Sequence, residues 1–158
     1  AMKKVAGTLK LTLAQYRSMQ AFAMFASDLD AATRQQLTRG ERLMELLKQP
    51  QFTPYPVEEQ VVSVWTGTNG YLDDLEVSEV LPFEAALLGY LRRSSSVLET
   101  IRSTGQLTEE TEAQLKADVE AFRSSYAAGD HLLTGEVAAA EDEAPAERTS
   151  EQIVLKRG

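Results

Sequence analysis

The 158-residue sequence has no cysteine and a single histidine, His131. Without cysteine, neither a disulfide framework nor a thiolate metal site can form. A nucleophile that depends on a histidine base could use only His131, which stands alone near an acidic segment and is expected to be solvated. Phosphate-binding patterns of the GxxxxGK[ST] and GxGxxG types are also missing. The residues themselves therefore predict no enzyme activity for this sequence on its own.

Long apolar runs and basic clusters are lacking as well. The longest apolar run covers residues 21–26, whereas a membrane-spanning helix needs about 20 residues. The first residues, Ala1-Met-Lys-Lys, are not followed by the apolar region of a signal peptide. An alanine before Met2, in a helix-like segment, suggests that the sequence begins inside a longer chain. The net charge of −8 without a basic stripe disfavours nucleic-acid binding.

What is present suits one soluble domain, with 43% hydrophobic and 25% charged residues. The most informative stretch is 27–52. Asp28 and Asp30 are N-cap types, and apolar residues then recur at helical spacing; the predicted buried face carries Leu37, Met44 and Leu47, with Gly40 and Leu43 beside them. Prolines 50, 54 and 56 end this helix. Because a mid-helix glycine costs roughly 1 kcal/mol, we expect another backbone to pack closely against Gly40.

Five further helices are expected. The first two cover residues 2–6, stopped by Gly7, and residues 13–25, capped by Thr12, with an inward face of Leu13, Tyr16, Met19, Ala23 and Met24. The next two run from Pro56 or Val57 to the glycine cluster at 67–70 and from Ser78 to Gly105, with a weak point at 94–96; the last is capped by Thr108 and buries Leu115, Val119, Phe122 and Tyr126. Residues 8–11 are expected as an extended link. No segment shows a convincing run of alternating β-branched residues. The sequence therefore predicts an all-α bundle of about six helices.

The domain is predicted to cover residues 1–128, followed by a different segment at 129–158. From residue 129 onward there are 7 acids and 3 bases, and the stretch 135–152 is rich in alanine and glutamate without aromatics. Such a composition buries too little surface to offset ordering entropy, so this tail is expected to be disordered. It ends in a short apolar-basic cluster, Ile153, Val154, Leu155, Lys156 and Arg157.

Three carboxylate pairs, 28/30, 58/59 and 73/74, are the remaining candidates for chemistry. Helix caps and solvated helix starts explain them more simply than a metal site or an acid–base pair, since a metal would need further converging ligands. Glu58 and Glu59 are therefore expected to face solvent. A carboxylate-based hydrolase is disfavoured by the scattered acids and the single histidine.

Seven blocks in one order resemble the C-terminal domain of the alpha subunit of F-type ATP synthase: residues 1–11 (AMKKVAGTLKL), 13–17 (LAQYR), 27–33 (SDLDAAT), 39–43 (RGERL), 46–49 (LLKQ), 57–61 (VEEQV) and 67–73 (GTNGYLD). The resemblance covers about residues 1–127. Met24 and Trp65 stand where the family more often has glutamine and tyrosine. The resemblance implies a helical bundle at the membrane-facing end of an alternating alpha/beta hexamer. The complex would be peripheral on the cytoplasmic face of the cell membrane, and this domain would not insert into the membrane.

The resemblance also implies roles for particular residues. Gln49 and Gln51 are similar to the pair that approaches the adenine of the non-catalytic nucleotide; otherwise they are solvated loop amides. Asp28, Leu29 and Asp30 resemble the loop that faces the rotating gamma subunit, which is compatible with a plain N-cap. The phosphate-binding loop belongs upstream in the family. We therefore expect ATP or ADP with magnesium in the full subunit, and weak or no nucleotide binding by this chain alone.

The segment from about residue 128 resembles the longer alpha tails of actinobacterial enzymes, which are associated with restraint of ATP hydrolysis. Residues Ile153 to Arg157 could bind a neighbouring subunit, and an unbound solvating tail is the open alternative. Composition alone also allows a protein of another class, a free-standing helical interaction or regulatory adaptor. Contact with the beta and gamma subunits is expected only on the first of these two interpretations.

Overall fold

The computed structural model describes residues 1–25, 28–48 and 54–127, and over this part of the chain the structure is helical without strands. Six α-helices and one 3₁₀ helix follow in the order α1 (Met2–Ala23), α2 (Ala31–Leu46), α3 (Val57–Thr68), η1 (Val77–Glu79), α4 (Val80–Ser94), α5 (Val97–Thr104) and α6 (Glu109–Ala127). The predicted all-α class and the number of helices are confirmed. The expected disorder of 129–158 concerns residues outside the described part.

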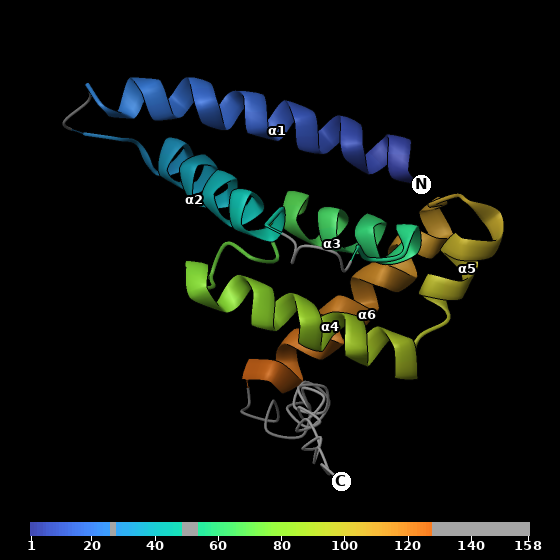
Figure 1. The fold of residues 1–158 in the computed structure, drawn as a ribbon. Coiled ribbons are helices and arrows are strands. Elements are labelled where there is room, and N and C mark those ends of the chain that lie inside the picture. Colours follow the sequence, from blue (N-terminus) through green and yellow to red (C-terminus); the bar gives the residue numbers. More distant parts are fainter. Residues whose placement is uncertain (26–27, 49–53, 128–158) are drawn as a thin grey trace, which may run out of the picture.

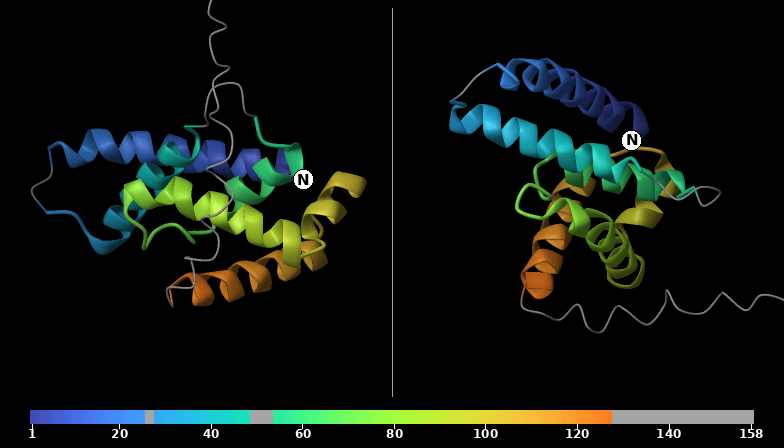
Figure 2. Two further views of the ribbon diagram at one scale, coloured as in Figure 1. Left: turned by 60° about the horizontal axis from the view of Figure 1, so that its bottom comes forward. Right: turned by 60° about the vertical axis from the view of Figure 1, so that its left-hand side comes forward.

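α3 lies in the middle of the bundle. It packs against α1, α2 and α5, while α4 and α6 pack against one another on the far side (Figure 1). α1 and α2 run antiparallel as the outer pair, and the second view in Figure 2 shows them stacked above α3 and α4. A helix in this position must be apolar on several sides, and α3 accordingly buries Val61, Val62 and Trp65.

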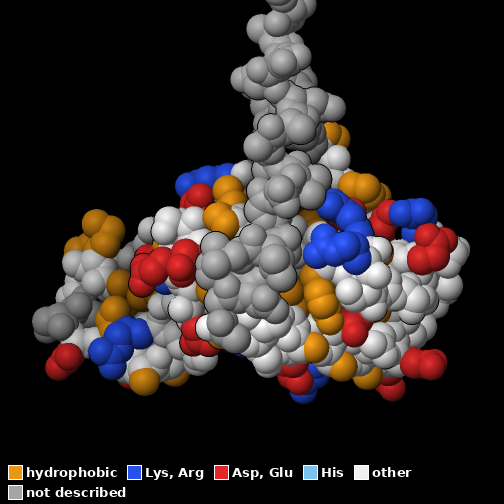
Figure 3. Space-filling view, turned by 90° about the horizontal axis from the view of Figure 1, so that it is seen from below, with side chains coloured by type: hydrophobic (Ala, Val, Ile, Leu, Met, Phe, Trp, Pro, Cys, Tyr) orange, Lys and Arg blue, Asp and Glu red, His pale blue; other side chains and the backbone are white. Residues whose placement is uncertain are grey.

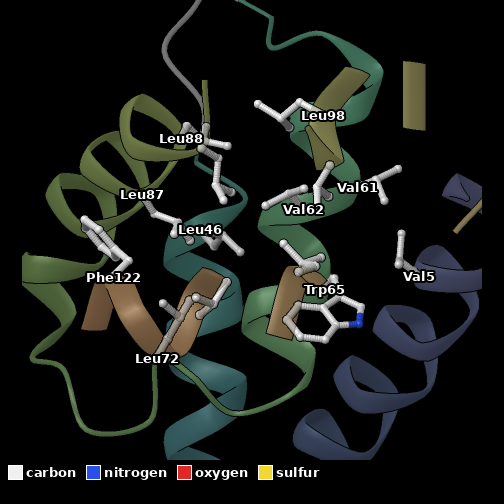
Figure 4. Close-up of a cluster of buried hydrophobic side chains, with 14 of the residues drawn as sticks. Val5, Leu46, Val61, Val62, Trp65, Leu72, Leu87, Leu88, Leu98 and Phe122 are labelled. Atoms are coloured by element: carbon white, nitrogen blue, oxygen red, sulfur yellow. The ribbon is translucent and has the colours of Figure 1, made fainter. Parts of the chain in front are cut away.

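The hydrophobic core joins all six helices around α3. Figure 4 shows Leu46, Leu72, Leu87 and Phe122 converging on the side chains of α3. Phe83 of α4 meets Phe122 and Tyr126 of α6 edge-on at centroid distances of 5.3 and 5.1 Å, and the two α6 rings contact one another at 5.4 Å. The predicted buried face of the last helix is confirmed at Leu115, Val119 and Phe122, which are at most 4% exposed.

The sequence-based boundaries were wrong at the N-terminus. Gly7 does not stop a helix, and residues 8–11 are not extended, because α1 runs unbroken from Met2 to Ala23. The Thr12 hydroxyl does not cap a helix start but donates to the Thr8 carbonyl at 3.0 Å, one turn back. The apolar positions Val5 and Leu9 stay in helical register across Gly7, so packing outweighs the local cost of the glycine.

The helix expected from Ser78 to Gly105 is two helices. Ser95 adopts an extended conformation (φ −134°, ψ 146°) between α4 and α5, and its hydroxyl accepts a hydrogen bond from the Val97 amide at 3.1 Å. The predicted weak point is therefore a full break. Gly105 closes α5 in the left-handed region at φ +66°, and the Thr108 hydroxyl caps α6 through the Thr111 amide, both as expected.

The buried face of α2 is also shifted from the predicted one. Gly40, Leu43 and Leu46 are buried, whereas Met44 and Leu47 are 40% and 44% exposed. The face is set by the side on which α3 lies, which the periodicity alone could not distinguish. The mid-helix glycine does have a packing reason, but the neighbour is a side chain rather than a backbone: a Cβ at Gly40 would lie 2.2 Å from Tyr16 Cγ.

Replacing Gly40 by alanine should lower the free energy of unfolding by about 1–3 kcal/mol, because the new methyl group overpacks against Tyr16. Gly7→Ala is the matched control, since a Cβ there meets nothing within 4 Å. It should instead raise the free energy of unfolding by about 0.5–1 kcal/mol through helix propensity. Urea unfolding followed by circular dichroism measures both; equal shifts of the same sign would refute the close contact.

Candidate functional site

The connection between α1 and α2 forms one tip of the molecule, where the candidate residues Asp28, Leu29 and Asp30 lie (Figure 1). Asp28 and Asp30 are exposed and Leu29 is half-buried. Asp30 is the N-cap of α2, and its carboxylate accepts a hydrogen bond from the Thr33 amide at 3.3 Å. The hydrogen bonds from Thr33 hold the pKa of Asp30 below its usual range. The predicted N-cap is confirmed, and the carboxylate is charged.

Three large apolar side chains surround this end of α1. Phe22, Met24 and Phe25 are 65%, 80% and 90% exposed, although the helical spacing predicted a buried position for Met24. Figure 3 shows apolar side chains at this end of the molecule, on the left, together with acidic and basic ones. Several large apolar side chains exposed within four residues of one another are typical of a protein contact. We call Phe22, Met24, Phe25, Asp28 and Asp30 the hairpin tip.

α2 fastens the hairpin tip to the centre of the bundle. The Arg39 guanidinium contacts the Asp73 carboxylate through Nε at 3.2 Å and Nη2 at 2.6 Å, and Arg42 Nε donates to the Leu75 carbonyl at 2.9 Å. Such forked contacts fix orientation as well as distance. Gly70, at φ +84°, lets the turn approach, since a Cβ there would lie 2.4 Å from Arg39 Nη2. Asp73 is therefore a structural anchor rather than a solvated acid.

The second predicted site cannot be placed, because Gln49 and Gln51 lie outside the described residues. The same holds for Ile153 to Arg157. On the described side of the connector, Gln60 Nε2 donates to the Tyr55 carbonyl at 2.7 Å, which ties the start of α3 to the residues before it. Burial, together with the nearby Glu84 and Glu59, raises the pKa of Tyr55.

The acidic pair at the start of α3 corrects the expectation of solvated carboxylates. Glu58 and Glu59 are only 7% and 5% exposed. Glu59 takes a forked ion pair from Arg92 of α4, at 2.8 and 2.7 Å, and Glu58 accepts from Arg102 of α5 at 2.9 Å. The backbone amide of Glu58 and then Arg102 hold the pKa of Glu58 below its usual range. Sequence could not identify these partners, which are 33 and 44 residues away.

Glu84 is a functional candidate that sequence analysis did not identify. It lies on α4, is 3% exposed, and its Oε1 has no hydrogen-bond partner among the described residues; the same is true of Ser63 Oγ on α3. Burial raises the pKa of Glu84, nearby Ser63 opposes the rise, and the charge of Glu59 adds to it. A carboxyl of this kind favours the neutral, protonated form inside the interface between α3 and α4.

Other kinds of site find no support in the described part of the chain. No group of three His, Asp or Glu side chains there is arranged to hold a metal ion. None of the helices in the same part combines the length and the apolar character that a bilayer span requires.

Comparison with known families decides what this bundle is. The family described as "ATP synthase alpha/beta chain, C terminal domain" matches residues 1–122, which include all six helices apart from the last turn and a half of α6. The chain belongs to this family. The match confirms the resemblance inferred from the seven sequence blocks, and it favours the synthase over the free-standing adaptor that composition alone allowed.

Curated relatives in this family are named ATP synthase subunit alpha. The chain is 63% identical to that of Kocuria rhizophila over 131 residues, covering 83% of this chain and 24% of the relative. It is 56% identical to those of Beutenbergia cavernae and an Arthrobacter species, over 99% of this chain and 29% of each relative. The chain thus spans less than a third of the length of these relatives. The last two alignments continue through the acidic segment after α6.

In this family member, Glu84→Gln should raise stability at neutral pH. The pKa of Glu84 is higher in the folded than in the unfolded chain, so the carboxyl costs stability as pH rises from the unfolded value through the folded one. Glutamine mimics the protonated form, and the gain over the unsubstituted chain should vanish in acid, where glutamate is protonated in both states. Urea midpoints between pH 3.5 and 8 measure this.

The control for this titration is Glu99→Gln on α5, since that carboxylate is 69% exposed and pairs with Arg102 only at the surface. Exposed pairs contribute about 0–1 kcal/mol. A gain for Glu84→Gln that does not change with pH would mean that the ionisation of Glu84 is not the cause.

Proposed function

We propose that this chain is the domain through which the alpha subunit of a rotary, proton-driven ATP synthase couples nucleotide-dependent movement to its central rotor. The observation that carries the proposal is the hairpin tip, where two exposed carboxyl side chains and three exposed apolar side chains lie at one end of a rigid bundle. The sequence resemblance implies that this loop faces the gamma subunit. Contact with a rotor surface would explain why Phe22, Met24 and Phe25 are exposed in this chain.

The path from the tip inward supports a mechanical role. α2 begins at Asp30 and is clamped to the turn before η1 by Arg39 and Arg42. Gly40 lies directly under Tyr16 of α1. A force on the tip would therefore move α1, α2 and the turn together as one body rather than bend α2. Packed interfaces of this kind transmit displacement because they do not deform continuously.

The nucleotide enters the proposal through the connector that follows α2 in the sequence. We propose that Gln49 and Gln51 hydrogen-bond the adenine of ATP or ADP held with magnesium by the full subunit, since amides can donate to and accept from a base edge. The phosphates would be held by parts of the subunit that this chain does not include. Catalysis would take place next to the beta subunits, in a hetero-oligomer peripheral to the cytoplasmic face of the membrane.

The segment after α6 completes the proposal. Residues 128–158 would restrain ATP hydrolysis, and the apolar-basic residues Ile153 to Arg157 would provide the binding contact. Its composition supports a tethered role rather than a packed one, because an acidic spacer without aromatic residues can bury too little surface to offset the entropy of ordering.

Rotor contact can be tested in the assembled synthase by attaching a cleavable photo-crosslinker to Asp28→Cys. The expected result is a covalent adduct between the alpha and gamma subunits and a loss of ATP turnover that cleavage of the linker restores, because a bond between stator and rotor blocks rotation. Lys116→Cys is the control; this residue is exposed on α6, away from the tip. Adducts at position 28 with beta alone, or none, would sink the proposal.

The tail can be tested by deleting residues 130–158 from the alpha subunit of the same enzyme. Hydrolysis of ATP should rise while the folded bundle, which ends at Ala127, is unaffected. A second variant that keeps the length and replaces residues 153–157 by glycine and serine separates the contact from the spacer. Unchanged hydrolysis in both variants would remove the restraining role.

A further inference from the structure

A groove of about 650 Å³ lies between the last turns of α6 and the segment that contains η1 and the start of α4. Figure 1 shows the end of α6 beneath the beginning of α4. The groove is distinct from the hairpin tip and from the connector after α2. Its lining combines apolar Leu75, Phe83 and Tyr126 with acidic Asp74, Glu79 and Glu120.

The apolar part of this groove is a floor of packed rings. Phe83 is 1% exposed and meets Tyr126 edge-on at 5.1 Å between centroids. Leu75 and Tyr126 are half-buried beside it. An aromatic and aliphatic floor of this kind suits small branched side chains of a partner segment.

The rim of the groove is negatively charged. Arg123 also lines it, but its guanidinium is paired with Asp74 at 2.8 Å. The Glu120 carboxylate pairs with the exposed Lys116 at 3.9 Å and accepts a hydrogen bond from the Tyr71 hydroxyl at 3.5 Å, and Glu79 accepts from the Glu76 amide. The acidic side chains of the lining therefore outnumber its basic ones. This charge favours the binding of a segment that carries Lys or Arg and disfavours an acidic one.

The chain contains a segment with this chemistry, and it is tethered to the groove. α6 ends at Ala127, which itself lines the groove. Residues 128–152, 25 in all, then separate it from Ile153, Val154, Leu155, Lys156 and Arg157. A flexible chain of that length spans roughly 25–30 Å on average, so it can return to its own root. The intervening residues carry seven acids and one base, and the acidic rim would repel them.

We propose that residues 153–157 bind in this groove of the same chain. Ile153, Val154 and Leu155 cover the half-buried Leu75 and Tyr126, and Lys156 and Arg157 lie over Glu79 and Glu120. The tether supplies an effective concentration in the millimolar range, so a modest contact is sufficient. The inference does not rest on the rotor contact. The sequence led us to expect a neighbouring subunit as the binding partner of residues 153–157; here the binding site lies on the same chain.

The cysteine-free sequence allows a clean test by disulfide formation. Ser124 is exposed in the groove, so the 158-residue chain is prepared as Ser124→Cys with Val154→Cys and, for comparison, as Ser124→Cys with Ala140→Cys. A free tail closes the shorter loop at position 140 roughly 2.5-fold faster than the longer one, by the −3/2 power of loop length. Docking reverses this order, and we expect position 154 to react at least about three-fold faster than position 140.

Charge variants in the Ser124→Cys, Val154→Cys background show whether the rim is responsible. Lys156→Glu with Arg157→Glu should return the rate to that of a free tail, and adding Glu120→Lys should restore much of the loss. Both disulfide pairs share the same α6 substitution, so any effect on folding cancels. Faster closure at position 140 overturns the proposal in favour of a free tail. Disulfides between chains rather than within one overturn it in favour of a neighbouring molecule.

Discussion

Two helix glycines determine how closely the first three helices stack, and the rest of the bundle depends on that spacing. A Cβ at Gly40 of α2 would lie 2.2 Å from the ring of Tyr16 of α1, and one at Gly67 of α3 would lie 2.6 Å from Leu43 Cδ2 of α2. Each glycine therefore removes the one atom that would push two helices apart. Because α3 in turn packs on α5, a larger residue at either glycine would displace helices throughout the core. The helix propensity lost at each position is outweighed by the contacts that the close approach allows.

Local signals were sufficient at the end of α5 and at the start of α6, where the deciding partner lies within a few residues. Thr108 and Gly105 were identified correctly because a cap and a left-handed closing residue act on their own helix. Gly7 was misjudged because its effect depends on what packs beside it, and α1 continues through it on the strength of distant contacts. The exposure of Met44 and Leu47 has the same origin: periodicity gives a face to within one residue, and only the neighbouring helix selects between the candidates.

The charged interior could not be predicted at all. Glu58, Glu59 and Asp73 resemble surface acids in the sequence, yet each is held by an arginine 33 to 44 residues away. Such pairs contribute modestly to stability, because desolvation offsets much of the attraction, but they strongly disfavour any other packing of the helices concerned. The same argument applies to Glu112, which accepts from the Trp65 indole at 2.8 Å and pairs with Lys4. It joins α1, α3 and α6 at a single carboxylate.

The contrast between this fixed interior and the hairpin tip suggests where motion is tolerated. Around α3, forked ion pairs and glycine contacts leave few alternative arrangements. At the tip, Phe22, Met24 and Phe25 are exposed although helical spacing would place such residues in a core. An isolated domain gains nothing from three exposed aromatic and thioether side chains beside two carboxylates, since water contact with apolar surface is unfavourable. A contact with another subunit, as proposed above, would remove this apolar surface from water while the bundle behind it keeps its shape.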